Sequence, residues 1–314
     1  MENKIEFVHK PIMLSECINA LNIKPDGIYA DGTVGGAGHS SHIASLLDFK
    51  KGGRLLCLDR DPDAVSVATE RLSKFKAATV YHRNYSEIVS LLDELNINGL
   101  DGMLLDLGVS SFQLDCAERG FSYRSDAPLD MRMSKTGLSA RDVVNGYSQE
   151  ALSQIIFSYS EEKFARRIAA EIVKRREIKT IETTFELSEI IASAMPAAAR
   201  REKNPSKRTF QAIRIEVNGE LDHLRNALDS VFTVLNKGGR LAIITFHSLE
   251  DRIVKQKYKE WSAGCTCPKD FPVCVCGNTP KAKMTPSKAI EPSKQEQEEN
   301  PRSKSSRLRV LEKL

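Results

Sequence analysis

The chain has 314 residues, of which 41% are hydrophobic, and its formal net charge at pH 7 is +4. This length allows one large domain or two with a hydrophobic core, and the mild basic excess does not by itself identify a partner. The lack of an apolar run of about 18 residues argues against a membrane span, and seven cysteines without an apolar N-terminal signal indicate a reducing cytoplasm.

The first predicted elements lead into a glycine-rich loop. Residues 11–21 have the spacing of an amphipathic helix, and residues 25–27 form a turn. The stretch Ile28-Tyr-Ala-Asp-Gly-Thr-Val-Gly-Gly-Ala-Gly-His39 begins as a buried strand and breaks into a loop, and residues 40–47 are again helical in spacing. Strand, glycine-rich loop and helix open the nucleotide-binding α/β folds, although an ordinary strand–helix turn has the same form.

The second predicted strand, residues 54–59, ends in a carboxylate that suits a ribose. Asp59 follows the loop at close to the roughly 20-residue offset at which an acidic residue accepts from both ribose hydroxyls. The loop is a poor dinucleotide fingerprint, because the third glycine of the pattern would be Ser41, and Asp31 would repel a pyrophosphate. S-adenosylmethionine carries a ribose and two cationic groups but no phosphate, so the pattern favours a methyl donor over NAD.

Further strands and helices alternate along the chain up to residue 107. A helix starts near Pro62, and the next strand and helix are predicted at 78–82 and 86–95, before a fourth strand at 103–107. This alternation predicts a mostly parallel sheet with ligands at the carboxyl ends of its strands. Four polar side chains fall at or near such ends: Asp31, Asp59, Tyr85 and Asp106.

The alternation stops after about residue 110, and a charged, helix-like block follows. Helices are predicted at 149–158, 161–176 and 185–195, and the second carries six basic residues, namely Lys163, Arg166, Arg167, Lys174, Arg175 and Arg176. A charged helix can be a solvated face or a phosphate-binding surface, and both interpretations stay open for it. The proline-interrupted basic segment 200–208 is predicted to be a loop that contacts phosphates.

The α/β pattern resumes near residue 211. Residues 211–236 are predicted to be mostly helical, residues 237–240 a turn, 241–246 a fifth strand and 249–261 a helix. The segment 285–304, rich in Pro, Ser, Lys and Glu, is predicted to be loose. Residues 306–312 can close the sheet as a last strand.

Four cysteines lie close together in the C-terminal part of the chain: Cys265, Cys267, Cys274 and Cys276. Four thiolates can hold a structural zinc ion, but the usual zinc knuckle has two residues between paired cysteines, and here there is one. A single intervening residue makes tetrahedral geometry from one loop harder. We therefore favour ordinary reduced cysteines and predict no metal site, with zinc as the alternative.

With these segments placed, the chain resembles the bacterial 16S ribosomal RNA cytosine-N4 methyltransferases, the RsmH/MraW family. The matching stretches span nearly the whole chain: Asp31–His39, Leu58–Pro62, Asp101–Ser111, Glu118–Ser122, Pro128–Met133, Arg208–Arg214 and Phe246–Val254. The resemblance implies a class I S-adenosylmethionine-dependent methyltransferase, a Rossmann-like α/β fold with an inserted helical domain. The methyltransferase domain would comprise residues 1–110 and 213–314, and residues 111–212 would form the insertion for substrate recognition.

The same resemblance implies the activity and the site. Methyl would pass from S-adenosylmethionine to the N4 amine of a cytidine in the decoding region, near the P site of the small ribosomal subunit, in the cytoplasm. The implied donor-binding residues are Ala37, Gly38, His39, Asp59, Tyr85, Asp106 and Gln113. The family often has Gly at position 37 and Phe at position 85, and Tyr85 keeps a stacking face for the adenine.

Asp106 is the predicted catalytic residue. The cytosine amine is a poor nucleophile because its lone pair is delocalised, so an acceptor must draw on its N–H as nitrogen attacks. Many amino-methyltransferases place an acid or amide followed by Pro-Pro-aromatic at this point, whereas here Asp106 precedes Leu-Gly-Val-Ser. Asp106 is therefore expected to orient the donor, the acceptor amine, or both. The stacking aromatic must come from elsewhere, with Phe112, Phe121 and Tyr123 as candidates.

Other functions remain as alternatives to an RNA methyltransferase. A DNA cytosine-N4 methyltransferase is disfavoured by the missing Pro-Pro-aromatic motif, and a small-molecule or protein methyltransferase by the basic insertion. A non-catalytic RNA-binding factor with a zinc module would be distinguished by metal analysis together with donor binding. An NAD enzyme fits least well. The sequence leaves the oligomeric state open, including a homodimer.

Overall fold

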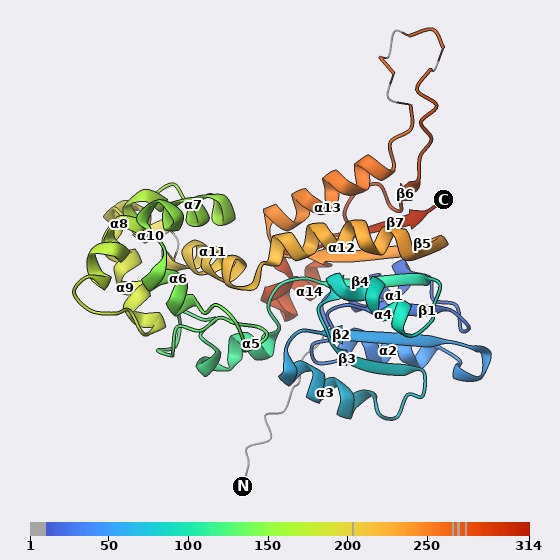
Figure 1. Ribbon diagram of the computed structural model, residues 1–314, viewed down its shortest axis with the longest axis horizontal. Helices are drawn as coiled ribbons and strands as arrows, with labels where there is room; N and C mark the ends of the chain where they lie inside the picture. Colours follow the sequence, from blue (N-terminus) through green and yellow to red (C-terminus); the bar gives the residue numbers. More distant parts are fainter. Residues whose placement is uncertain (1–10, 203, 266, 269–270, 274) are drawn as a thin grey trace. The chain divides into compact units, whose positions relative to one another are not determined.

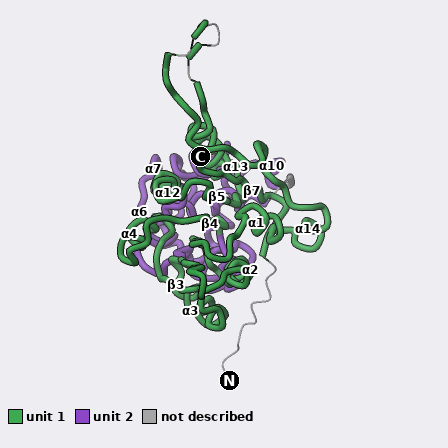
Figure 2. The backbone as a smooth tube through the Cα atoms, turned by 90° about the vertical axis from the view of Figure 1, so that its right-hand side faces the viewer, with its two compact units in different colours: residues 1–108, 222–314 green, residues 109–221 purple. Residues whose placement is uncertain are grey.

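The chain forms two compact units (Figure 2). The computed structural model describes residues 11–202, 204–265, 267–268, 271–273 and 275–314. The first unit comprises Met1–Gly108 and Asp222–Leu314, and the second comprises Val109–Leu221. The insertion was predicted to end at residue 212, and the second unit extends to residue 221, where α11 (Ser206–Asn218) contributes Phe210 and Ile213 to its core.

A seven-stranded sheet in the order β3-β2-β1-β4-β5-β7-β6 forms the centre of the first unit (Figure 1). Its strands are β1 (Ile28–Asp31), β2 (Arg54–Asp59), β3 (Ala78–His82), β4 (Leu100–Asp106), β5 (Leu235–Thr245), β6 (Ala282–Met284) and β7 (Arg307–Lys313). Strands β1 to β5 pair in parallel, and β7 is antiparallel to both β5 and β6. The structure confirms the predicted α/β fold class with a mostly parallel sheet.

Helices cover both faces of this sheet. They are α1 (Leu14–Leu21), α2 (Gly38–Leu46), α3 (Pro62–Leu72), α4 (Ile88–Glu94), α12 (Glu220–Val234), α13 (Ser248–Trp261) and α14 (Lys294–Glu299). On β2, Leu55 and Cys57 pack in one core cluster with α1, α2 and α3, whereas Leu56 and Leu58 pack in the other with α4, α12 and α13. Apolar residues on both faces are what a buried parallel strand requires.

The second unit is helical. It contains α5 (Ser111–Asp115), α6 (Ala140–Gly146), α7 (Gln149–Ser160), α8 (Ala165–Arg176), α9 (Thr184–Ala194), α10 (Ala197–Glu202) and α11. Hydroxyl side chains cap the first turns of several helices, as Ser139 does for α6 and Thr183 for α9, each in a capping box. Within the described ranges, no helix combines the length and apolar character that crossing a membrane requires.

Three local predictions were wrong. The basic segment 200–208 is mostly helical rather than a loop, because α10 and α11 extend into it; Lys203 lies outside the described residues. Residues 237–240 belong to β5, where the pairing steps from Leu100↔Leu235 to Gly102↔Arg240, so the expected turn is an irregularity within the strand. In 285–304, α14 and a 3₁₀ turn (Pro301–Ser305) are formed, and Glu296 accepts from the Met13 amide at 2.7 Å.

Candidate active site

The carboxyl ends of β1, β2 and β4 meet at one edge of the sheet in the first unit. Parallel pairing sets Asp31 beside Cys57 on β2 and Leu104 on β4, and Asp59 and Asp106 end their strands. Three of the four residues predicted at or near these strand ends, the carboxylates Asp31, Asp59 and Asp106, therefore lie at this edge, and Tyr85 follows β3. In open α/β sheets this edge is where ligands bind.

The loop after β1 turns sharply into α2. Gly35 has φ +48° and Ala37 has φ +61°, both in the left-handed region that favours glycine. The Ala37 amide donates to the Val34 carbonyl at 2.7 Å, and α2 begins at the next residue, Gly38. Position 37 thus requires left-handed backbone at the entry to the helix, which explains the preference for glycine there; alanine adopts it at a cost of roughly 1–2 kcal/mol.

Asp31 stabilises this loop from within. Its carboxylate accepts from the Ser40 hydroxyl at 2.6 Å and from the Thr33 amide at 3.1 Å. Its side chain is buried, and burial raises its pKa. Asp31 therefore links the start of the loop to the first turn of α2. Its carboxylate also adds negative electrostatic potential at the strand ends.

Asp59 also bonds to the loop backbone. Its Oδ2 accepts from the Gly35 amide and its Oδ1 from the Asp61 amide, each at 2.9 Å. Burial raises the pKa of Asp59 to about 6, and these two amides oppose the rise. Each carboxylate oxygen can accept more than one hydrogen bond, so both retain capacity for ribose hydroxyls.

Asp106 ends β4 next to the same loop. Its amide donates to the Thr33 hydroxyl at 2.6 Å, which fixes the strand end against the loop. One carboxylate oxygen, Oδ2, lies 3.8 Å from His39 Nδ1. The other, Oδ1, is buried, and no residue in the described part of the chain gives it a hydrogen bond. A buried acceptor without a protein partner is a position where a water molecule or a ligand can donate a hydrogen bond.

The electrostatic surroundings of Asp106 disfavour its charged form. Burial, followed by the nearby carboxylates of Asp31 and Glu250, raises the pKa of Asp106 to about 8. Glu250 caps α13, where it accepts from the Phe246 amide at 2.8 Å. Sequence reasoning missed Thr33 and Glu250; the signal for Glu250 was the acid three residues after the N-cap His247, a capping-box position.

His39 is held neutral beside Asp106. Its Nε2 lies 3.0 Å from the Ile12 carbonyl oxygen, which can only accept, so Nε2 carries the proton. Burial lowers the pKa of His39. The imidazole therefore supplies a neutral, oriented ring with the Nδ1 lone pair toward Asp106, and it supplies no positive charge.

The two remaining predicted donor residues lie in different units. Tyr85 follows β3 in the first unit, and a Cβ on Gly32 would come within 2.7 Å of the Tyr85 Cβ, so this glycine is required for packing against Tyr85. Gln113 lies in the second unit, where its Oε1 accepts from the Ser110 amide at 3.0 Å in the capping box of α5. The structure thus gives Gln113 a capping role that the sequence prediction did not include.

Two of the three candidate stacking aromatics are engaged within the second unit. Phe121 is buried in the helical core, and the Arg119 guanidinium lies 5.8 Å from its ring centroid. Tyr123 packs edge-to-face on Phe210 with the ring centroids 5.6 Å apart. Phe112 has an intermediate exposure at the start of α5.

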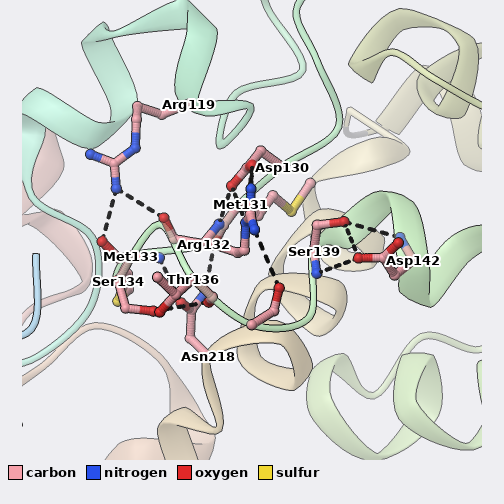
Figure 3. A network of polar contacts seen from close by, with 11 residues as sticks. Arg119, Asp130, Met131, Arg132, Met133, Ser134, Thr136, Ser139, Asp142 and Asn218 are labelled. Atoms are coloured by element: carbon pink, nitrogen blue, oxygen red, sulfur yellow. Dashed lines mark hydrogen bonds and ion pairs between the residues drawn. The ribbon is translucent and has the colours of Figure 1, made fainter.

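A polar network fixes the loop of the second unit that carries the Pro128–Met133 motif (Figure 3). Asn218 accepts from the Met133 amide and donates to the Met131 carbonyl, both at 2.8 Å. Met131 has φ +60° and is fully buried. The Arg119 guanidinium donates to the carbonyls of Arg132 and Met133 at 2.9 and 3.0 Å. The motif is thus a rigid backbone structure, which the sequence prediction did not anticipate.

The six basic residues of the predicted helix 161–176 lie in α8 except Lys163, which precedes it. Five are exposed, namely Lys163, Arg166, Arg167, Lys174 and Arg175. Arg175 pairs with Glu171 at 3.0 Å, and Arg176 donates to the Val144 carbonyl at 2.7 Å. Arg176 therefore links α8 to α6, whereas the Arg175–Glu171 pair is exposed and contributes little to stability.

The cysteine cluster lies between α13 and β6. Sulfur atoms of Cys265, Cys267 and Cys276 all lie within 4.8 Å of one another. Cys274 lies outside the described residues. The structure thus brings together three of the four cysteines that the sequence singled out.

Comparisons with known proteins agree with the predicted family. Residues 6–314 match the model of the MraW methylase family. The chain is 54% identical over 311 residues to a ribosomal RNA small subunit methyltransferase H from Clostridium botulinum (strain Kyoto / Type A2), covering 99% of this chain and 100% of that protein. It is 54% identical over 313 residues to a protein of the same name from Lachnospira eligens, covering 99% of each chain. The chain belongs to the MraW methylase family and is an S-adenosylmethionine-dependent methyltransferase.

Proposed function

We propose that this protein transfers a methyl group from S-adenosylmethionine to the N4 amine of a cytidine in the decoding region of 16S rRNA, in the cytoplasm. The observation that carries the proposal is the identity of 54% along the full length to proteins named ribosomal RNA small subunit methyltransferase H. The small ribosomal subunit, or its 16S rRNA, is then the macromolecular partner.

The site at the strand ends has the groups that such a donor requires. Asp59 would accept from the ribose hydroxyls, and the loop at Ala37, Gly38 and His39 would lie against the donor. The ammonium and sulfonium of the donor are cationic, and the carboxylates of Asp31 and Asp106 supply the complementary potential. Tyr85 offers an aromatic face for the adenine.

Asp106 is proposed to act on the cytosine amine. The nitrogen lone pair forms the new N–C bond as the S–CH₃ bond breaks. The electrons of the broken S–CH₃ bond stay on sulfur, which becomes a neutral thioether. The amine becomes acidic as it attacks, and Asp106 Oδ1, buried and without a partner in the described chain, is placed to accept its hydrogen bond or proton. Holding the amine in line with the methyl group supplies much of the remaining acceleration.

The helical unit is proposed to bind the rRNA. Its exposed cations Arg166 and Arg167 lie in the first turn of α8, Lys163 precedes that helix, and Lys207 and Arg208 begin α11. Exposed Lys and Arg side chains position nucleic acids through phosphate contacts. This assignment makes the insertion the substrate-recognition part of the enzyme.

The test is mass mapping of methylated cytidines in small-subunit rRNA from cells with and without the gene. The proposal predicts one decoding-region cytidine that loses its N4-methyl group in the deletion strain and regains it with the wild-type gene, but not with an Asp106→Asn gene. A companion assay offers labelled donor to 30S subunits, free 16S rRNA and duplex DNA. Label on duplex DNA alone would favour the DNA cytosine-N4 alternative and overturn the proposal.

A further inference from the structure

The segment between α13 and β6 lacks a hydrophobic core of its own. Among its described residues, from Ser262 to Lys281, none is buried. Phe271, Val273 and Val275 are 51%, 69% and 72% exposed. Figure 1 shows this segment leaving the end of α13 and returning to β6. A segment that buries no side chain needs another device, a covalent or metal cross-link, to hold a defined fold.

Backbone and side-chain bonds close the base of the segment. The Lys281 amide donates to the Trp261 carbonyl at 2.8 Å, and Asn278 Nδ2 donates to the Gly264 carbonyl at 2.8 Å. These bonds hold the outgoing and returning arms of the segment together at its base. Cys265 and Cys267 lie on the outgoing arm and Cys276 on the returning arm.

The three thiols are arranged as metal ligands are. Cys265 Sγ and Cys276 Sγ are 3.7 Å apart, far longer than a disulfide bond of about 2.05 Å. Two sulfur ligands on a tetrahedral zinc, each about 2.3 Å from the ion, are separated by about 3.8 Å. The Cys267 amide donates to Cys265 Sγ and the Val275 amide donates to Cys267 Sγ, each at 3.4 Å. Such N–H···S bonds orient and stabilise sulfur in its anionic form.

We propose that Cys265, Cys267 and Cys276 form a structural site for a zinc-class divalent ion. The sequence argued against a zinc site, because a single residue between paired cysteines makes tetrahedral coordination from one loop difficult. In the structure the ligands come from both arms of the segment, so Cys276 completes the site from the arm opposite Cys265 and Cys267. Thiolate ligands select zinc among the abundant divalent ions, and binding releases their protons. The fourth cysteine of the pattern, Cys274, lies outside the described residues, and the site rests on the three thiols described.

Zinc content of the full-length protein tests the proposal. The protein is purified in reducing, chelator-free buffer, and its metal is measured by mass spectrometry. Wild-type protein should carry about one zinc per chain, released when a mercurial reagent blocks its thiols. Cys267→Ser and Cys276→Ser should each lower the zinc content at least tenfold. Cys116→Ser, a cysteine of the second unit outside the cluster, is the matched control and should retain the metal.

A second measurement separates loss of the site from loss of the fold. Replacing zinc by cobalt(II) in the wild-type protein should produce thiolate charge-transfer and tetrahedral d–d absorption, and Cys267→Ser should lack both while binding S-adenosylmethionine normally. Wild-type protein without zinc, equal loss in Cys116→Ser, or a Cys265–Cys276 disulfide in the purified protein would each overturn the proposal. These readouts do not depend on methylation, so they stand apart from the proposed rRNA activity.

Discussion

Asp106 Oδ2 lies 3.8 Å from His39 Nδ1, yet the imidazole does not neutralise the carboxylate. The Ile12 carbonyl fixes the proton of His39 on Nε2, and burial lowers the pKa of the ring. Burial, followed by the carboxylates of Asp31 and Glu250, raises the pKa of Asp106 to about 8. S-adenosylmethionine carries two cationic groups, and we propose that they compensate the negative charge of Asp106.

Replacing Asp106 should affect turnover more than binding of RNA. Asp106→Asn keeps the size and one acceptor oxygen but removes the charge that stabilises the amine as it rehybridises. We expect kcat to fall about 10²–10⁴-fold, the range for a positioned proton acceptor, with RNA affinity nearly unchanged. Single-turnover methylation at saturating donor measures this. A rate close to wild type, with only the donor KM raised, would make Asp106 a donor-orienting residue instead.

Donor affinity should depend on pH through Asp106. Its pKa of about 8 means that the carboxyl is protonated below that pH, whereas a cationic donor favours the ionised form. Donor affinity should therefore rise between about pH 6 and 8, approaching tenfold per unit, and level off above it. Calorimetry across this range measures the slope. Asp106→Asn controls for titration of the donor's own amine, and the same slope in that variant would exclude Asp106 as the source.

Asp59 is expected to contribute to both the loop and the donor. Asp59→Ala removes the acceptors for the Gly35 and Asp61 amides and those proposed for the ribose. Affinity for S-adenosylmethionine should fall by about 1–3 kcal/mol, or roughly 5–150-fold. Calorimetry with Asp93→Ala, an exposed acid on α4, as the control measures the difference. Equal affinities in the two variants would remove Asp59 from the donor site.

The exposed cations at and just before the start of α8 should determine the salt dependence of RNA binding. Changing Lys163, Arg166 and Arg167 to Gln should lower the slope of log affinity against log salt by about 0.7 for each RNA phosphate that the variant no longer neutralises. Donor affinity should not change. The control variant changes Lys50, Lys51 and Lys76. These exposed residues precede β2 and β3, so they lie at the edge of the sheet opposite to the strand ends that carry Asp59 and Asp106. A slope that stays at the wild-type value would make the α8 charges a solvated surface.

Asn218 should be a stability determinant of the second unit. Asn218→Ala leaves the Met133 amide and the Met131 carbonyl without their side-chain partner in a buried place. We expect a loss of about 2–4 kcal/mol in the free energy of unfolding. Urea denaturation measures it, with the exposed Gln154→Ala on α7 as the control. Similar midpoints for the two variants would show that the network adds little.

Local sequence patterns determined the sheet and the family. Alternation of apolar strands with helical segments, and Asp31, Asp59 and Asp106 at strand ends, predicted a parallel sheet with its site at one edge, because strand direction alone brings such ends together. The motifs from Asp31–His39 to Phe246–Val254 identified the family, which the match over residues 6–314 confirms.

Contacts between segments far apart in sequence were decided only by the tertiary structure. The composition of segment 285–304 predicts a loose chain, yet α14 forms with Ser293 as its N-cap, and Glu296 accepts from the distant Met13 amide. Neither the burial that raises the pKa of Asp106 nor the approach of His39 and Glu250 can be predicted from strand spacing. Cys276 likewise meets Cys265 only because the segment folds back on itself. Local spacing specifies hydrogen bonding and side-chain periodicity, whereas desolvation and long-range pairing depend on where the whole chain packs.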